Sequence, residues 1–229
     1  MKKIFLLIAV SLSFIRCNDD ISNEYTYLFV RSYICEYIDN DLTVSPRGAI
    51  YPIYEPIGIS GWFPHYDVSE TGRTVRYLAP EFGSTGSEAE RFLEIAERNG
   101  DLSYNQKILC IEGTCQSPAI CCADNFKAMH VRCLNAAWDD AHPAGTPLDD
   151  ITVVEYYSYA EFVRNGYRTG ASSVQKLLKD LTSTDLAMTN TIFNYSFVRT
   201  PPAGTYEMEV TFVTTEGEEK SATCTLAIE

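Results

Sequence analysis

The chain has 229 residues, with 31 acidic and 18 basic side chains and a formal net charge of −13. This acidity argues against nucleic acid or an anionic membrane surface as a partner, because both require a basic contact surface. The length is enough for one large domain or two small ones with a buried core.

The first residues have the pattern of an export signal. Lys2 and Lys3 precede an apolar run, Ile4 to Ile15, that is too short to span a bilayer, which takes about 20 apolar residues. Cys17 follows directly. The pattern predicts a signal peptide over residues 1–16 and acylation of Cys17. The alternative is an ordinary secretory signal that contains Cys17 by chance, although Arg16 is a poor residue before such a cleavage site.

The four residues Cys17, Asn18, Asp19 and Asp20 resemble the start of mature Bacteroidota lipoproteins. In that family a short acidic stretch after the lipidated cysteine accompanies export to the outer face of the outer membrane. The resemblance implies a lipid-anchored protein at the cell surface, with the outer membrane as a partner through the anchor.

The cysteine count favours disulfides. Acylation of Cys17 would leave seven cysteines in a chain that passes through an oxidising compartment, where disulfides form and persist. The candidates are Cys35, Cys110, Cys115, Cys121, Cys122, Cys133 and Cys224. Their spacing matches neither a structural zinc site nor a plant-type iron–sulfur site.

The N-terminal region, 17–119, is expected to be rich in strands and loops. Tyr25–Ile38 is dense in β-branched and aromatic residues and predicts one or two strands, after which prolines and glycines break the chain into short extended pieces. The aromatic cluster Gly61–Tyr66 is either an exposed platform or a plug over one end of a sheet. As a platform, it would make Trp62, Phe63 and Tyr66, together with Trp138, ligand-binding candidates.

One helix is expected in this region, at Ser87–Asn99. Ser87 is the candidate N-cap, Glu90 is its capping-box partner, and Gly100 ends the helix. The apolar stripe that we expect to pack against the rest of the protein consists of Ala89, Phe92, Leu93 and Ala96.

The C-terminal region, 120–229, predicts an antiparallel sandwich. Strands are expected at Phe126–Leu134, Ile151–Tyr157 and Asn190–Thr200, followed by a hairpin of Thr205–Thr214 and Lys220–Ile228. Strands with one apolar and one polar side belong to sheets packed face to face. Cys133 and Cys224 fall on predicted inward faces, and we therefore predict a bridge between them.

Short helices are expected between these strands. Ser158 is a candidate cap for one that ends at Gly166. Ser172 begins a second, in which the apolar residues follow helical spacing at Val174, Leu177, Leu178 and Leu181.

A more specific resemblance lies between the first two C-terminal strands. The segment WDDAHPAGTPLDD, with YYSYAEFVRNGY and KDLTSTDLAM after it, is similar to a recurring segment of uncharacterised Bacteroidota surface lipoproteins. The resemblance covers about the last hundred residues and implies an immunoglobulin-like β-sandwich. It implies no catalytic residue, because those relatives have no assigned activity.

Four carboxylates lie at the two ends of this loop, at Asp139, Asp140, Asp149 and Asp150. They are candidates for a calcium site, because hard cations prefer oxygen ligands. The spacing lacks the alternate acids and central glycine of a calcium loop, and Asp149 can equally act as a turn residue that binds backbone N–H groups. No other cofactor is expected.

No catalytic motif is present, whether a nucleophile elbow, a zinc-protease helix or a phosphate loop. We therefore expect a mainly β, non-catalytic, surface-anchored module that binds a glycan, a peptide or a host surface. The alternatives are an exported hydrolase whose site is built from non-contiguous residues, and a structural subunit of a surface fibre or envelope complex.

Overall fold

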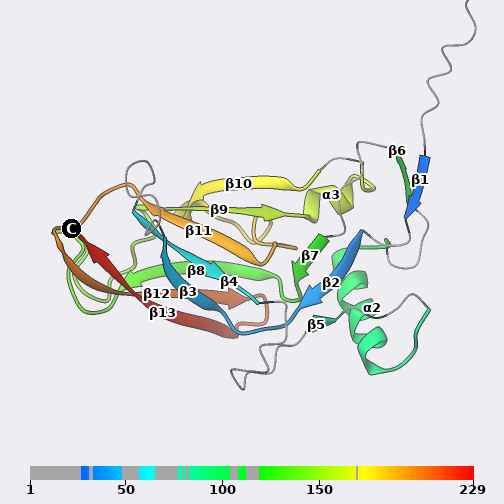
Figure 1. Ribbon diagram of the computed structural model, residues 1–229, viewed down its shortest axis with the longest axis horizontal. Helices are drawn as coiled ribbons and strands as arrows, with labels where there is room; N and C mark the ends of the chain where they lie inside the picture. The colour runs from blue at the N-terminus through cyan, green and yellow to red at the C-terminus, as the bar shows by residue number, and fades with distance from the viewer. Residues whose placement is uncertain are drawn as a thin grey trace, which may run out of the picture.

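The computed structural model describes residues 27–30, 33–47, 57–64, 77–78, 80, 83–103, 108–111, 119–168 and 170–229 (Figure 1). The predicted signal peptide at 1–16, Cys17, Tyr66 and Cys115 lie outside the described residues.

The largest sheet has five antiparallel strands in the order β10-β9-β11-β4-β3. These strands are β3 (Thr43–Arg47), β4 (Gly58–Trp62), β9 (Thr152–Ser158), β10 (Ser172–Leu177) and β11 (Ile192–Phe197). The β3–β4 pair comes from the N-terminal half of the chain, and β4 pairs with β11 from the C-terminal half. Strands from both halves therefore form one sheet.

A second, three-stranded sheet packs against the first in the order β13-β12-β8. Its strands are β8 (Phe126–Cys133), β12 (Gly204–Thr214) and β13 (Glu219–Ile228). Figure 1 shows the two sheets as stacked layers. Alternate side chains of both sheets, such as Val131, Phe212, Val154 and Phe193, meet in one core, which confirms the predicted inward faces of β8 and β12.

A smaller region with its own core lies at one end of these layers (Figure 1). Its sheet has the order β5-β2-β7, and a separate two-stranded sheet pairs β1 with β6. The elements are β1 (Tyr27–Val30), β2 (Ile34–Ile38), β5 (Tyr77–Leu78), β6 (Ile108–Ile111), β7 (Ala119–Cys122) and the helix α2 (Ser87–Asn99). The prediction of one or two strands within 25–38 is confirmed by β1 and β2.

The helix α2 has the predicted bounds but not the predicted cap. Gly86 is the N-cap residue, and no side chain caps the helix there, so the assignment of this role to Ser87 is wrong. Gly100 ends the helix in the left-handed conformation, as expected. The buried stripe contains Phe92 and Ile95, and the sequence prediction had Leu93 in place of Ile95.

The two helices predicted between the C-terminal strands have different outcomes. The first is confirmed as α3 (Ala160–Arg164), but its N-cap residue is Tyr159 and it ends before Gly166, so the capping role given to Ser158 and the predicted end are wrong. The Ser158 hydroxyl still accepts a bond from the Ala160 N–H. The second is wrong, because Ser172 begins the edge strand β10 and only Leu178–Asp180 forms a short 3₁₀ helix, η2. Tertiary pairing with β9 overrides the helical spacing: Val174 reaches the core from the extended β10, and Leu178 reaches it from η2.

The predicted Cys133–Cys224 bridge is also wrong. Met208 of β12 is the register partner of both cysteines, so a whole strand separates them. Two strand spacings are about 10 Å, whereas a disulfide needs Cα atoms within about 7 Å. All five cysteines whose side chains the structure describes are free thiols: Cys35, Cys121, Cys122, Cys133 and Cys224. The prediction of a disulfide framework is thus corrected for these five.

The fold is mainly β, as predicted, with antiparallel strands in both large sheets. The immunoglobulin-like connectivity stays a prediction. In the described part of the chain, neither α-helix is long and apolar enough to cross a bilayer.

Candidate binding face

The outer face of the five-stranded sheet, which points away from the core, carries three rows of side chains that run across the strands. Ile59, Phe193 and Val154 point into the core, so their neighbours along each strand point outward. From β3 to β10 two of the rows are Ser45–Ser60–Asn194–Glu155–Gln175 and Arg47–Gly58–Ser196–Val153–Leu177. The first row has two parts, Thr43–Trp62–Ile192 on β3, β4 and β11 and Tyr157–Ser173 on β9 and β10.

The first row exposes apolar side chains. Ile192 is 54% exposed and Tyr157 is 47% exposed, although most residues of their size in this sheet are buried. Ile192 is the register partner of Trp62, which is half-buried. Tyr157 and Ile192 lie two residues beyond the Glu155–Asn194 pair, toward the same end of the sheet. Tyr157 itself lies opposite Asn190, whose N–H donates to the Tyr157 carbonyl at 2.8 Å. The apolar strip thus consists of the paired Trp62 and Ile192, with Tyr157 at the same end of the sheet.

The second row is polar along its whole length. The Ser60 hydroxyl donates to Oδ1 of Asn194 at 3.0 Å, and Asn194 is paired in register with Glu155. Gln175, at the edge of the sheet, is exposed. Because hydroxyl, amide and carboxylate groups all occur here, the row offers both donors and acceptors.

The third row is held together across a glycine. A Cβ at Gly58 would overlap the carbonyl oxygen of Tyr195, so β4 and β11 approach more closely than any other residue would allow. Arg47 reaches over this position, and its Nη1 donates to the Ser196 hydroxyl at 3.5 Å. Gly58 therefore adds no side chain to this part of the face.

Of the three described aromatic residues that were predicted to bind a ligand, Trp62, Phe63 and Trp138, only Trp62 lies on this face. Phe63, the next residue, points into the core and packs against Phe126 and Phe212. Trp138 is fully buried against Phe197, and its indole N–H donates to the Arg199 carbonyl at 2.9 Å. The ligand-binding predictions for Phe63 and Trp138 are therefore corrected, because core packing takes up both rings.

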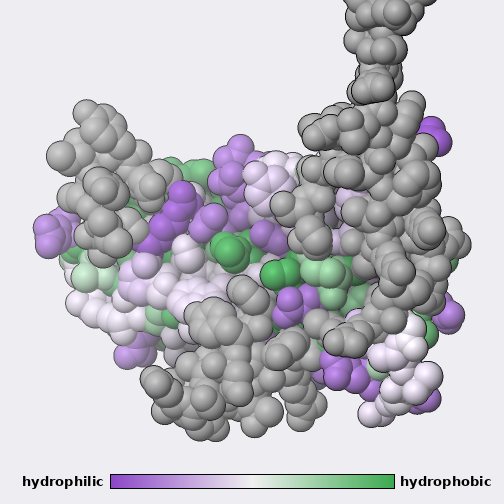
Figure 2. Space-filling view, turned by 45° about the vertical axis from the view of Figure 1, so that its right-hand side comes forward, coloured by the Kyte–Doolittle hydropathy of each residue, from purple (hydrophilic) through white to green (hydrophobic). Residues whose placement is uncertain are grey.

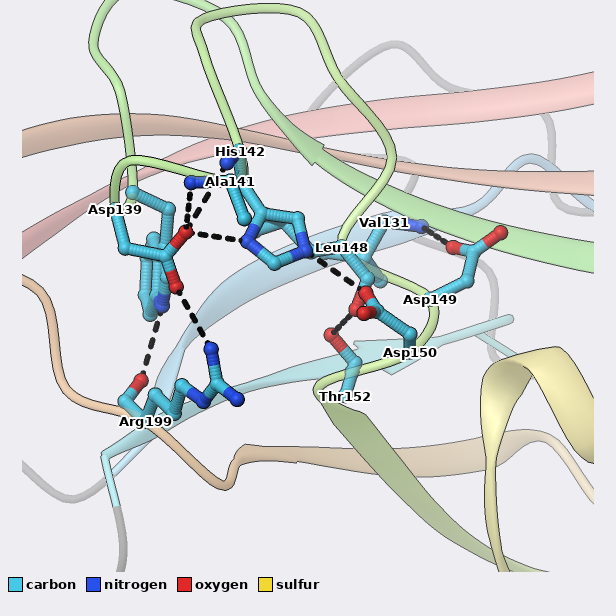
Figure 3. Close-up of polar contacts among 10 residues, drawn as sticks. Val131, Asp139, Ala141, His142, Leu148, Asp149, Asp150, Thr152 and Arg199 are labelled. Atoms are coloured by element: carbon cyan, nitrogen blue, oxygen red, sulfur yellow. Dashed lines mark hydrogen bonds and ion pairs between the residues drawn. The ribbon is translucent and has the colours of Figure 1, made fainter.

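The four predicted calcium ligands have other partners. Figure 3 shows Asp139 and Asp150 on opposite sides of the His142 ring, with Nδ1 2.6 Å from Asp139 and Nε2 2.8 Å from Asp150. Arg199 lies 3.6 Å from the second oxygen of Asp139, and Asp140 is exposed. Within the described ranges, no group of three or more His, Cys, Asp or Glu residues is arranged to hold a metal ion, which corrects the calcium prediction.

His142 is a charged structural residue. Burial opposes its charge, but the bonds to Asp139 and Asp150 outweigh burial and raise its pKa. The bonds to His142 in turn lower the pKa of both carboxyls. Ionised carboxylates only accept hydrogen bonds, so both ring nitrogens carry protons and neither is left to act as a base. Asp139, His142 and Asp150, which we call the clamp, link the two ends of the loop between β8 and β9.

A second histidine, His130, lies on the outer face of the three-stranded sheet and is paired with Asp149. Nδ1 of His130 is 2.7 Å from Asp149, whose other oxygen accepts the Val131 N–H at 3.1 Å. The latter bond agrees with the expectation that Asp149 binds backbone N–H groups. A pocket of about 210 Å³ beside the pair is lined by His130, Arg132, Pro147, Thr211 and Glu219.

Sequence reasoning missed most of the outer face, including Tyr157, Ile192 and Glu155. The alternation of Ile192, Asn194 and Ser196 with buried aromatic residues was a usable signal for β11. In ITVVEYY both sides of the strand are partly apolar, so the sequence did not reveal which tyrosine is exposed. On the side of the molecule shown in Figure 2, hydrophobic residues form small areas among hydrophilic ones.

Comparison with protein-family models, with curated proteins and with solved structures finds no match for this chain.

Proposed function

We propose that this chain is a non-catalytic binding module that holds an extended ligand on the outer face of its five-stranded sheet. The exposure of Tyr157 and Ile192 beside Trp62, on a hydrogen-bonded sheet, is the observation that carries the proposal. Exposed apolar groups gathered on one face mark interaction sites more often than scattered ones do. Because the five strands are cross-bonded, the face is preorganised, which lowers the entropic cost of binding.

The proposed setting is the outer surface of a bacterial cell, with the chain tethered by an acylated Cys17. The support is the signal sequence and the acidic residues that follow the cysteine. In this setting the hydroxyl and amide groups of the face would meet ligands outside the cell.

The test is an array of neutral polysaccharides, acidic polysaccharides and peptides, probed with the labelled full chain. A Tyr157→Thr/Ile192→Thr variant keeps β-branched residues in the strands, so the sheet is preserved. We expect it to lose at least about tenfold in affinity, equivalent to about 1.4 kcal/mol. Val198→Thr, at a residue that is 59% exposed outside the rows, is the matched control and should bind as the wild type does. Equal binding by all three proteins would contradict the proposal.

A second candidate function is hydrolysis at the His130–Asp149 pair. The observation in its favour is that a histidine oriented by a carboxylate lines a pocket together with the Thr211 hydroxyl. Turnover of chromogenic esters or glycosides by the wild type, abolished in His130→Gln, would establish this activity. Turnover by the wild type that does not exceed that of His130→Gln would rule out hydrolysis at this pair.

A further inference from the structure

We infer that the ligand of the outer face is an uncharged, linear glycan that lies across the strands, with sugar rings against Trp62 and Tyr157 and hydroxyl groups on the second row. This inference rests on the proposed function and names its ligand class.

The charge of the face selects an uncharged ligand. Its fifteen row positions hold one cation, Arg47, and one anion, Glu155, and the guanidinium of Arg47 contacts Ser196. The chain as a whole carries −13, which repels acidic polymers. A cationic polymer would meet a single carboxylate in the rows. Neither sign of charge is therefore favoured there.

The two kinds of row match the two kinds of surface on a sugar. A sugar ring has apolar C–H faces and a rim of hydroxyl groups, so it needs an aromatic surface beside hydrogen-bonding groups. The apolar strip and the polar row are two residues apart along each strand, or about 7 Å. A ring that lies on Tyr157 or Trp62 therefore has Glu155 or Ser60 within reach of its rim.

The arrangement also favours several linked rings over one. Trp62 and Tyr157 are on β4 and β9, with β11 between these two strands, so at least two strand spacings, about 10 Å, separate them. A single ring cannot cover both aromatic side chains. A linear chain of sugars across the strands can contact both.

The geometry is less suited to a peptide or to a second copy of the chain. An extended peptide gains affinity by pairing its backbone with a sheet edge, whereas this site is a sheet face whose backbone groups are already paired. A stable dimer buries roughly 800 Å² on each partner around an apolar core. In the rows, only Ile192 and Tyr157 are large hydrophobic residues with high exposure.

The experiment is affinity electrophoresis of the purified full chain in gels that contain hydroxyethyl cellulose, galactomannan or arabinoxylan. Carboxymethyl cellulose and polygalacturonate are the acidic counterparts, and gelatin is the peptide probe. We expect at least one neutral polysaccharide to retard the chain, with an affinity that is unchanged when NaCl rises from about 0.05 M to about 0.5 M, because no charge pair is involved.

Two variants assign the binding to the rows. Tyr157→Thr should weaken binding about 5- to 10-fold through loss of one stacked ring. Glu155→Gln, in the polar row, keeps the shape of the side chain but replaces a charged acceptor by a neutral amide, and should weaken binding of a neutral glycan about 3-fold. Val198→Thr should equal the wild type, and circular dichroism should show the same strand content in all four proteins.

Several outcomes would overturn the inference. Failure of all three neutral polysaccharides to retard the wild type would do so. Retardation only by an acidic polymer or by gelatin, weakened by Tyr157→Thr, would refute the glycan while the proposed function stands. A dimer that Tyr157→Thr dissociates would identify a second copy as the occupant. Retardation that Tyr157→Thr leaves unchanged would refute both the glycan inference and the proposed binding face.

Discussion

His142 and Asp150 are eight residues apart in the chain, and their side chains meet with Nε2 2.8 Å from a carboxylate oxygen. Asp139 holds the other nitrogen, so one imidazolium joins the two ends of the loop (Figure 3). The loop is thereby fixed by charge as well as by packing.

The first prediction concerns pH. The pKa of His142 is raised in the folded state, so its stabilising effect is complete below about pH 6.5 and is lost as the pH rises through the raised pKa. The pKa values of Asp139 and Asp150 are lowered, so their effect is complete above about pH 4 and is lost as the pH falls. The urea midpoint should therefore be highest between about pH 4 and pH 6.5.

His142→Gln should lower the urea midpoint in this range and remove most of its decline above about pH 6.5. Asp140→Asn, a neutralised carboxylate in the same loop that is exposed, should keep the decline. An unchanged pH profile in His142→Gln would show that the clamp does not couple protonation to folding.

The second prediction concerns the ring of Phe63. Phe63 is buried among Phe126, Phe193 and Phe212, so Phe63→Ala should lower the free energy of unfolding by roughly 3–5 kcal/mol. Val198→Ala, at an exposed site, is the control and should cost within about 0.5 kcal/mol. Urea denaturation checks both. A loss below about 1 kcal/mol for Phe63→Ala would mean that this ring does not fill the core.

The third prediction concerns thiols. Met208 lies between Cys133 and Cys224, so no peptide linking these two cysteines should appear in a non-reduced digest. Both should react with a thiol reagent in denaturant without prior reduction. Because burial raises the pKa of Cys224 to about 11, its thiol should react slowly in the folded protein at neutral pH. Recovery of the linked peptide would contradict the strand order.

The fourth prediction concerns the anchor. Expression of the full chain in a bacterium that processes lipoproteins should give a product without residues 1–16, with acyl mass on Cys17. Cys17→Ala should carry no acyl mass and should leave the membrane fraction. A wild-type product that keeps its first sixteen residues would exclude the proposed tether.

Local patterns predicted the elements in which spacing and burial agree. The helix Ser87–Asn99 and the alternation along β12 could both be predicted from the sequence, because one stripe or face is apolar and the other is polar. The segment from Ser172 misled because Val174, Leu177, Leu178 and Leu181 fit a helix. In the structure Leu177 is on the outer face, whereas Val174 packs on the core.

The proposed binding face could not be predicted from local sequence patterns, for a different reason. Its rows exist only once β3, β4, β9, β10 and β11 are in register, and Ser60 and Asn194, which share a hydrogen bond, are 134 residues apart. Sequence composition identified Trp62 as an aromatic candidate but could not separate it from Phe63, because adjacent residues of a strand point to opposite sides.

The pairing of β4 with β11 has a consequence for biogenesis. Strand β4 ends at Trp62, and its partner is synthesised only when the ribosome has passed Phe197. Contacts this distant in sequence form late and slowly. A nascent chain therefore cannot complete its main sheet until Phe197 has been made.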